Sequence, residues 1–159
     1  MNERLPELNL PPVDLKIKEE EGKVKVFDFL RRKYVAFTPE EYVRQHFVEY
    51  LAGSLHYPKG LMANEVSLDI NGLKRRCDTL ISNRDGSPLM VVEYKAPTIN
   101  ITQDVFDQIA RYNFVIGARY VVVSNGINHY CCVNDSKGGY NFLPKIPDFM
   151  ESQFSDSVN

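Results

Sequence analysis

The chain has 159 residues, a formal net charge of −2 and 43% hydrophobic residues. These values are ordinary for a soluble globular protein and predict one domain with a substantial core. The weak charge gives no global basic field and counts mildly against a polyanionic substrate, although a local basic patch could offset this. No apolar run is long enough for a membrane span, and none follows Met1–Arg4 as in a signal peptide. We therefore expect a cytoplasmic protein with no membrane partner.

The cysteines and histidines predict neither a disulfide framework nor a zinc site. Two of the three cysteines, Cys131 and Cys132, are adjacent, and no CxxC spacing occurs. His46, His56 and His129 lack a Cys/His ligand pattern and are expected to be structural. Reduced thiols are typical of cytoplasmic proteins.

The first part of the chain is expected to contribute little to the core. Residues 1–22 are rich in Pro, Glu, Lys and Asn and predict an N-terminal arm with little packing of its own. Lys23–Asp28 alternates polar and apolar residues, which indicates an edge strand, and Tyr34–Phe37 is its candidate hairpin partner. The basic triplet Arg31–Lys33 between them could contact phosphate but is more typical of a solvated turn.

A helix is predicted to begin at Thr38. Thr38 can cap it, Pro39 suits its first turn, and Glu41 lies where it would complete a capping box. A wide apolar side continues to about Ser54. It contains Tyr42, Val43, Phe47, Val48, Tyr50 and Leu51.

Three consecutive antiparallel strands are expected after this helix. Met62–Ile70 alternates apolar and polar residues, and Asn71-Gly72 is a two-residue hairpin turn. The next two strands are Arg75–Ser82 and Leu89–Lys95, joined by a polar loop with an Asp-Gly turn.

The rest of the chain predicts a helix followed by two strands. The helix runs from Thr102, its cap, to Ile116, and Val105, Ile109, Tyr112 and Val115 lie on or near one apolar stripe. Two strands follow, at 119–124 and 129–133, and the first is apolar on both faces like a central strand. Residues 134–139 are expected to be a loop, and the chain after them an irregular tail.

The order helix, three strands, helix and strands predicts an α/β fold with a central mixed sheet flanked by helices. The three expected parts are the arm at 1–22, the domain at 23–146 and a C-terminal tail at 147–159.

The hairpin around the second turn carries the sharpest chemical signal. If the hairpin is symmetric about Asp85-Gly86, Asp78 lies directly opposite Glu93, where like charges about 5 Å apart are destabilising. Strand alternation places Glu93 and Lys95 on one face. Two carboxylates and an ammonium suggest a hard divalent cation that can polarise a phosphoryl oxygen. From spacing alone, an exposed salt bridge of Lys95 with either acid is an equal alternative.

Asp78, Glu93 and Lys95 also resemble the D-x(n)-E-x-K signature of the PD-(D/E)xK nuclease superfamily. The element order resembles the core of that superfamily. Several segments are closer still to the N-terminal nuclease domain of the restriction subunit of type I restriction enzymes, over roughly residues 38–133. These segments are 38–45, 74–78, 91–97 and 111–113.

The resemblance implies roles for six residues. Asp78 and Glu93 would hold Mg²⁺, with Mn²⁺ possible, Lys95 would be the catalytic lysine, and Glu41 would assist the metal site. Gln108 and Tyr112 match a Q-x-x-x-Y motif placed beside the active site and DNA, and they share a helix face.

The resemblance further implies an endonuclease that hydrolyses DNA, with separate restriction-system subunits or a motor protein as further partners. Two features depart from the family. The chain contains no phosphate-binding loop of a helicase motor, so cleavage coupled to translocation could not come from it alone. The proline of the superfamily's name is replaced by Cys77. The alternatives are a DNA-binding or assembly module that does not cleave and a metal-free scaffold.

Overall fold

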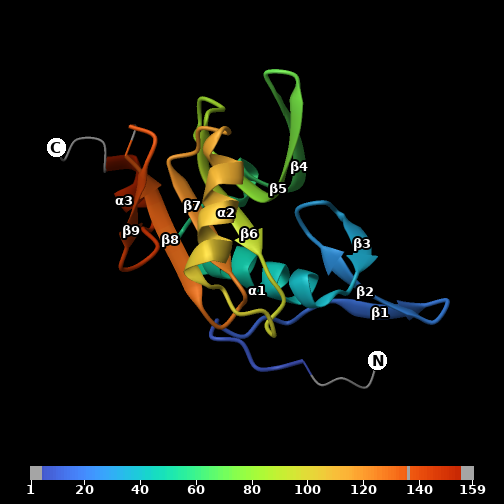
Figure 1. Ribbon diagram of the computed structural model, residues 1–159. Coiled ribbons are helices and arrows are strands. Elements are labelled where there is room, and N and C mark those ends of the chain that lie inside the picture. The colour runs from blue at the N-terminus through green and yellow to red at the C-terminus, as the bar shows by residue number, and fades with distance from the viewer. Residues whose placement is uncertain (1–4, 136, 155–159) are drawn as a thin grey trace.

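A six-stranded mixed sheet organises the chain (Figure 1). The computed structural model describes residues 5–135 and 137–154. The strand order is β4-β5-β6-β7-β8-β9, and every neighbouring pair is antiparallel except β6 and β7, which are parallel. The strands are β4 Met62–Ile70, β5 Leu73–Ser82, β6 Pro88–Tyr94, β7 Tyr120–Ser124, β8 His129–Asn134 and β9 Tyr140–Leu143. The mixed α/β fold expected from the sequence is therefore confirmed.

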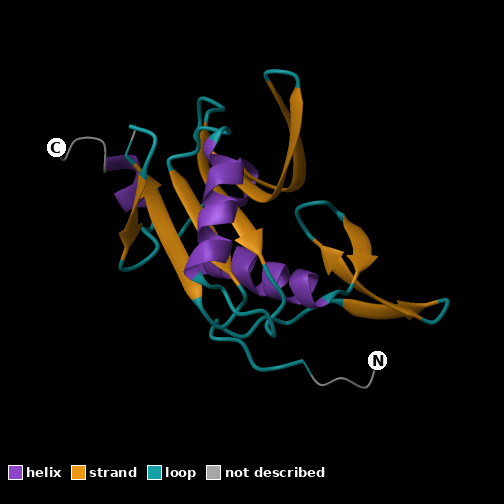
Figure 2. Cartoon of the chain, in the orientation of Figure 1, coloured by secondary structure: helices purple, strands orange, loops and turns teal. Residues whose placement is uncertain are grey.

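Two helices cover opposite faces of this sheet (Figure 2). Helix α1, Pro39–Gly53, packs its buried Val43, Phe47 and Leu51 into one cluster with Val122 of β7. Helix α2, Gln103–Phe114, packs against Val123, the next residue of the same strand. Successive residues of a strand face opposite sides. Strand β7 is thus buried on both faces, as its apolar sequence predicts.

The register of the β5–β6 hairpin agrees with the prediction. Thr79 lies opposite Val92 and Leu80 opposite Val91, and this register continued by one residue places Asp78 opposite Glu93. The pairing shifts only near the turn, between Ile81 and Ser82.

Helix α1 is capped as its sequence predicts, but only half of the capping box forms. The Thr38 hydroxyl accepts a hydrogen bond from the Glu41 N–H at 3.1 Å. The Glu41 carboxylate turns away and accepts hydrogen bonds from Arg31 and Gln45 instead of reaching back to the cap. This leaves Glu41 beside the sheet, where it contributes to the site described below.

The N-terminal arm, expected to have little packing of its own, is more ordered than predicted, although none of residues 5–22 is fully buried. A second sheet, in the order β1-β2-β3, joins Ile17–Glu20, Lys23–Asp28 and Lys33–Ala36. Strand β2 is therefore its central strand and not an edge strand. The backbone N–H of Asn9 also donates to the Gly126 carbonyl at 2.8 Å. The polar composition of residues 1–22 does not predict these contacts, because β1 pairs with β2 across a tight turn and Asn9 bonds to a residue far along the chain.

The C-terminal segment is also more ordered than expected. Strand β9 follows the predicted loop, and helix α3 spans Phe149–Phe154. The Tyr57 hydroxyl donates to the Pro147 carbonyl at 2.7 Å, which fixes the start of the segment that was expected to be an irregular tail. Residues 155–159 of that predicted tail lie outside the described part.

The buried face of α2 differs from the predicted stripe. Ile109 is buried, but Tyr112 and Val115 are 38% and 45% exposed. The helix instead buries Phe106, Ala110 and Asn113 together with Ile109, which recur at helical spacing. No helix in the described part of the chain is long and apolar enough to cross a membrane.

Candidate active site

Four of the six predicted site residues line one cleft of about 490 Å³ between α1, the middle of β5 and the end of β6. They are Glu41, Asp78, Glu93 and Lys95. Other charged residues lining the cleft are Arg31, Glu40, Arg44 and Glu65. The salt bridge of Lys95 with Asp78 or Glu93, the alternative reading of the spacing, does not form among the described residues.

Asp78 and Glu93 form the electrostatically strained part of the cleft. Burial first of all, and then the nearby Asp78, raise the pKa of Glu93 to about 7, against the opposing effect of Lys95. Burial also raises the pKa of Asp78, against the hydrogen bond that it accepts from the Tyr94 N–H at 2.9 Å. Both shifts mean that the ionised carboxylates are unfavourable in this cleft unless a further cation is present.

This pair fits a hard divalent cation. Asp78 uses only Oδ2 in the contact with Tyr94, and the Glu93 carboxylate makes no hydrogen bond or ion pair with residues 5–135 or 137–154. No group of three His, Cys, Asp or Glu side chains in those ranges is arranged to hold a metal ion. Mg²⁺ commonly binds one or two carboxylates and completes its shell with water and phosphate oxygens. Asp78 and Glu93 supply the two carboxylates that such binding requires.

Strand β4 bends where it reaches the cleft, at Glu65. Glu65 has a φ of 56°, a left-handed conformation that is unusual within a strand. Asn64, the residue before Glu65, donates a hydrogen bond to Asp28 on the α1 side of the sheet. Val66, the residue after Glu65, packs with Cys77 on the opposite face. The bend therefore interrupts the strand alternation and delivers the Glu65 carboxylate to the cleft.

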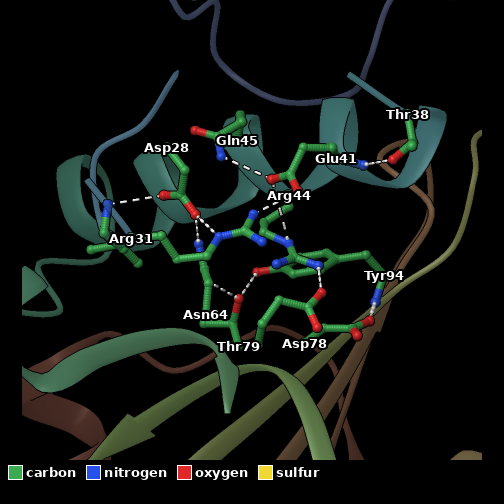
Figure 3. Close-up of polar contacts among 12 residues, drawn as sticks. Asp28, Arg31, Thr38, Glu41, Arg44, Gln45, Asn64, Asp78, Thr79 and Tyr94 are labelled. Atoms are coloured by element: carbon green, nitrogen blue, oxygen red, sulfur yellow. Dashed lines mark hydrogen bonds and ion pairs between the residues drawn. The ribbon is translucent and has the colours of Figure 1, made fainter. Parts of the chain in front are cut away.

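Arg44 connects the acids of the cleft (Figure 3). Its guanidinium lies 2.5 Å from Glu65 Oε1 and 3.6 Å from Glu41 Oε2. It also lies 5.6 Å from the centre of the Tyr94 ring. The residue is only 4% exposed, so these contacts are shielded from water.

The turn expected around the basic triplet forms, but the Arg31 side chain is not solvated as the sequence suggested. This side chain is 18% exposed, pairs with Asp28, and donates to Glu41 Oε1 at 2.6 Å. The two buried carboxylates attract this member of the basic triplet inward. The neighbouring Arg32 and Lys33 are exposed.

Gln108 and Tyr112 do not line the cleft. Gln108 is exposed on α2. Tyr112 is connected to the cleft residue Glu65 only through Arg76 of β5. The Tyr112 hydroxyl accepts from the Arg76 N–H at 3.2 Å, and the Arg76 guanidinium lies 2.6 Å from Glu65 Oε2. Arg75 stacks 4.7 Å over the Tyr112 ring. Contact of Gln108 and Tyr112 with DNA remains a prediction.

Sequence reasoning did not identify Arg44 or Glu65 as site residues. The sequence carries a signal for each. Symmetry about the Asn71-Gly72 turn puts Glu65 opposite Asp78, and Arg44 follows Glu41 by three positions on the same helix face.

The comparisons with known proteins agree with the fold. Residues 39–147, more than half of the chain, match the family model described as type I restriction enzyme R protein N terminus. A solved fragment from Vibrio vulnificus YJ016, described as an HsdR subunit of a type I restriction enzyme, has a similar fold with a TM-score of 0.55 and 17% identity. The match covers 76% of this chain but only 26% of that one. No curated protein matches the sequence significantly.

Proposed function

Because the chain belongs to the family of type I restriction enzyme R protein N termini, we propose that it is a Mg²⁺-dependent DNA endonuclease domain. One observation carries the proposal: Asp78, Glu93 and Lys95 line one cleft, and ionisation of the two buried carboxyls is unfavourable there without a further cation. This is the arrangement that binding a cation and a phosphodiester requires.

Asp78 and Glu93 are the residues that would hold Mg²⁺, or Mn²⁺ in its place. The bound ion would supply polarisation of the phosphoryl oxygen and a lower pKa for water. Lys95 would stabilise the charge that develops on the phosphate or orient the attacking water. Glu41 would support the site from α1 without binding the ion itself, because its oxygens already accept hydrogen bonds from Arg31 and Gln45.

Tyr112 and Gln108 would contact the DNA beside the cleft. Tyr112 supports Arg75, whose guanidinium can pair with a backbone phosphate, and Gln108 lies one turn earlier on the same helix face. DNA and the other subunits of a restriction system would be the partners. A motor protein would supply any translocation.

The test is nicking of supercoiled plasmid DNA in the presence of Mg²⁺ or Mn²⁺. We expect cleavage by the wild-type chain and none by Asp78→Ala or Lys95→Ala. Wild-type cleavage that persists in both variants would contradict the proposal. A gel shift without cleavage under either ion would favour the alternative, a DNA-binding or assembly module that retains the nuclease fold.

A further inference from the structure

Arg44 is a buried cation placed among the carboxylates of the cleft. It lies on α1 one turn after Glu41, and its side chain crosses toward the sheet (Figure 3). Its Nη2 is 2.5 Å from Glu65 and its Nε is 3.6 Å from Glu41. With 4% of its surface exposed, it holds a full positive charge away from solvent at this place.

Besides the exposed Glu40, four carboxylates line the cleft, and two of these are fully engaged by protein cations and amides. Both Glu41 oxygens have partners, Arg31 at 2.6 Å on Oε1 and Gln45 at 2.9 Å on Oε2. Glu65 is likewise held on both oxygens, by Arg44 at 2.5 Å and by Arg76 at 2.6 Å. A carboxylate held in this way has to lose a charged partner before it can bind a metal ion.

The other two carboxylates remain available. Asp78 engages one oxygen with the Tyr94 N–H, and Glu93 has no ion-pair or hydrogen-bond partner in the described ranges. The contrast divides the cleft into a pair of acids neutralised by the protein and a pair left for another cation.

Arg44 itself is incompletely satisfied. Its Nε and Nη1 are buried and have no hydrogen-bond partner among the described residues. Buried donors without partners cost free energy, so packing alone would not favour an arginine here. The positive charge of Arg44 explains its position better, because the guanidinium takes the place of a cation that Glu41 and Glu65 would otherwise attract.

We propose that Arg44 is a fixed internal cation that, together with Arg31 on Glu41 and Arg76 on Glu65, keeps these two acids out of metal coordination. The cleft then binds one divalent ion, on Asp78 and Glu93. The inference rests on the proposed metal-dependent function. Sites with two metals hold the ions about 4 Å apart and need carboxylates to share between them. In this cleft the additional carboxylates would be Glu41 and Glu65, which Arg44 bridges. Arg44 is thus a positioning residue that sets the number of ions.

The experiment is a Mn²⁺ titration followed by calorimetry and by electron paramagnetic resonance. Wild-type protein is expected to bind one Mn²⁺ per chain and to give the spectrum of an isolated ion. Arg44→Met, which removes the charge at similar length, is expected to bind two and to show a spin-coupled spectrum. Arg44→Lys, which keeps the charge, is expected to bind one.

The outcomes separate this inference from the proposed function. Two ions bound to the wild type, or one ion bound to a folded Arg44→Met variant, would overturn the role of Arg44 and leave the metal site intact. No Mn²⁺ binding by the wild type would contradict the metal-dependent function and this inference with it.

A second variant covers the case in which Arg44→Met fails to fold, which circular dichroism would reveal. Glu41→Gln is expected to retain one bound Mn²⁺ with an affinity within about threefold of wild type. Loss of about tenfold or more, the size expected when even a hydrogen-bond partner of a metal ligand is removed, would overturn the inference. Glu40→Gln, an exposed neighbour that also lines the cleft, is the matched control for the change in local charge.

Discussion

The backbone N–H of Tyr94 donates to Oδ2 of Asp78 at 2.9 Å, and this contact fixes the carboxylate in the middle of β5 against the end of β6. The hydrogen bond favours the ionised form of Asp78, whereas burial disfavours it, and burial prevails because the pKa is raised. The fold therefore holds the Asp78 side chain in place, although the ionised form of this carboxyl is unfavourable there. An external cation would relieve this cost.

Asp78→Asn is expected to separate these two roles. The amide oxygen can still accept from Tyr94, and the buried charge is gone, so the metal-free variant should be at least as stable as wild type at pH 8. Plasmid nicking should fall about 100-fold or more, because a neutral amide is a poor ligand for Mg²⁺. Urea denaturation and a nicking assay measure the two quantities. Glu19→Gln, at an exposed acid on β1, should change neither, and a nicking rate of Asp78→Asn close to wild type would contradict the catalytic assignment.

The raised pKa of Glu93 predicts that the metal-free protein loses stability as the pH rises. The carboxyl has a pKa of about 7 in the folded protein and 4.5 as its ordinary value. Because the folded state binds the proton more tightly, the stabilising contribution is complete below pH 4.5 and is lost as the pH rises through 7. Between pH 5 and pH 8 the loss should be roughly 1–3 kcal/mol.

Glu93→Gln cannot titrate and provides the comparison for this prediction. Urea denaturation without divalent ions should show that the variant gains stability relative to wild type as the pH increases from 5 to 8. Parallel curves for the two proteins would rule out a raised Glu93 pKa. Mg²⁺ should reduce the difference, because the ion competes with the proton for the same carboxylate.

Thr79 lies at the centre of a buried hydrogen-bond chain that supports the site. Its hydroxyl donates to Asn64 Oδ1 at 2.6 Å and accepts from the Tyr94 hydroxyl at 2.8 Å. Thr79→Val keeps the shape but leaves two buried polar groups without partners, so we expect a loss of about 2–4 kcal/mol in the free energy of unfolding. Thr98→Val, at an exposed position, should stay within about 0.5 kcal/mol of wild type in the same urea titration. A loss at Thr79 as small as that control would mean that the chain contributes little stability.

The parts of the site that the sequence predicts are those fixed by local rules. Two-residue alternation and the Asp85-Gly86 turn bring Asp78 opposite Glu93, and the Thr38 cap sets the start of α1 above them. These relationships depend on neighbouring residues and on hairpin geometry, which the sequence encodes directly.

The remaining features depend on contacts between distant segments. The left-handed conformation of Glu65 breaks the alternation of β4, and no turn residue marks it in the sequence. Arg31 and Arg44 are buried because each pairs with a carboxylate of another element, Arg31 with Glu41 of α1 and Arg44 with Glu65 of β4. The exposed face of α2 follows from how the helix meets the sheet, which left Tyr112 outside the core.

The contact between Arg75 and Tyr112 predicts how this edge of the cleft would meet DNA. The Tyr112 ring lies 4.7 Å beneath the Arg75 guanidinium and holds it in place, whereas the hydroxyl makes one exposed hydrogen bond with the Arg76 N–H. Tyr112→Ala should weaken DNA binding about two- to fivefold, because a cation–π contact at an exposed site is worth about 0.5–1 kcal/mol. Tyr112→Phe keeps the ring and should bind DNA about as tightly as wild type. Equal affinities of the Ala and Phe variants would contradict the role of the ring.

Arg75→Ala tests the same surface by changing how DNA affinity depends on salt concentration. If Arg75 neutralises one phosphate, its removal should lower the slope of log affinity against log salt concentration by about one. Fluorescence anisotropy with a short duplex at several salt concentrations measures this slope, in an Asp78→Asn background that prevents cleavage. Lys23→Ala removes an equal charge from β2 in the small sheet and should leave the slope unchanged. If both variants lower the slope equally, binding depends on overall charge and Arg75 has no specific place on the DNA.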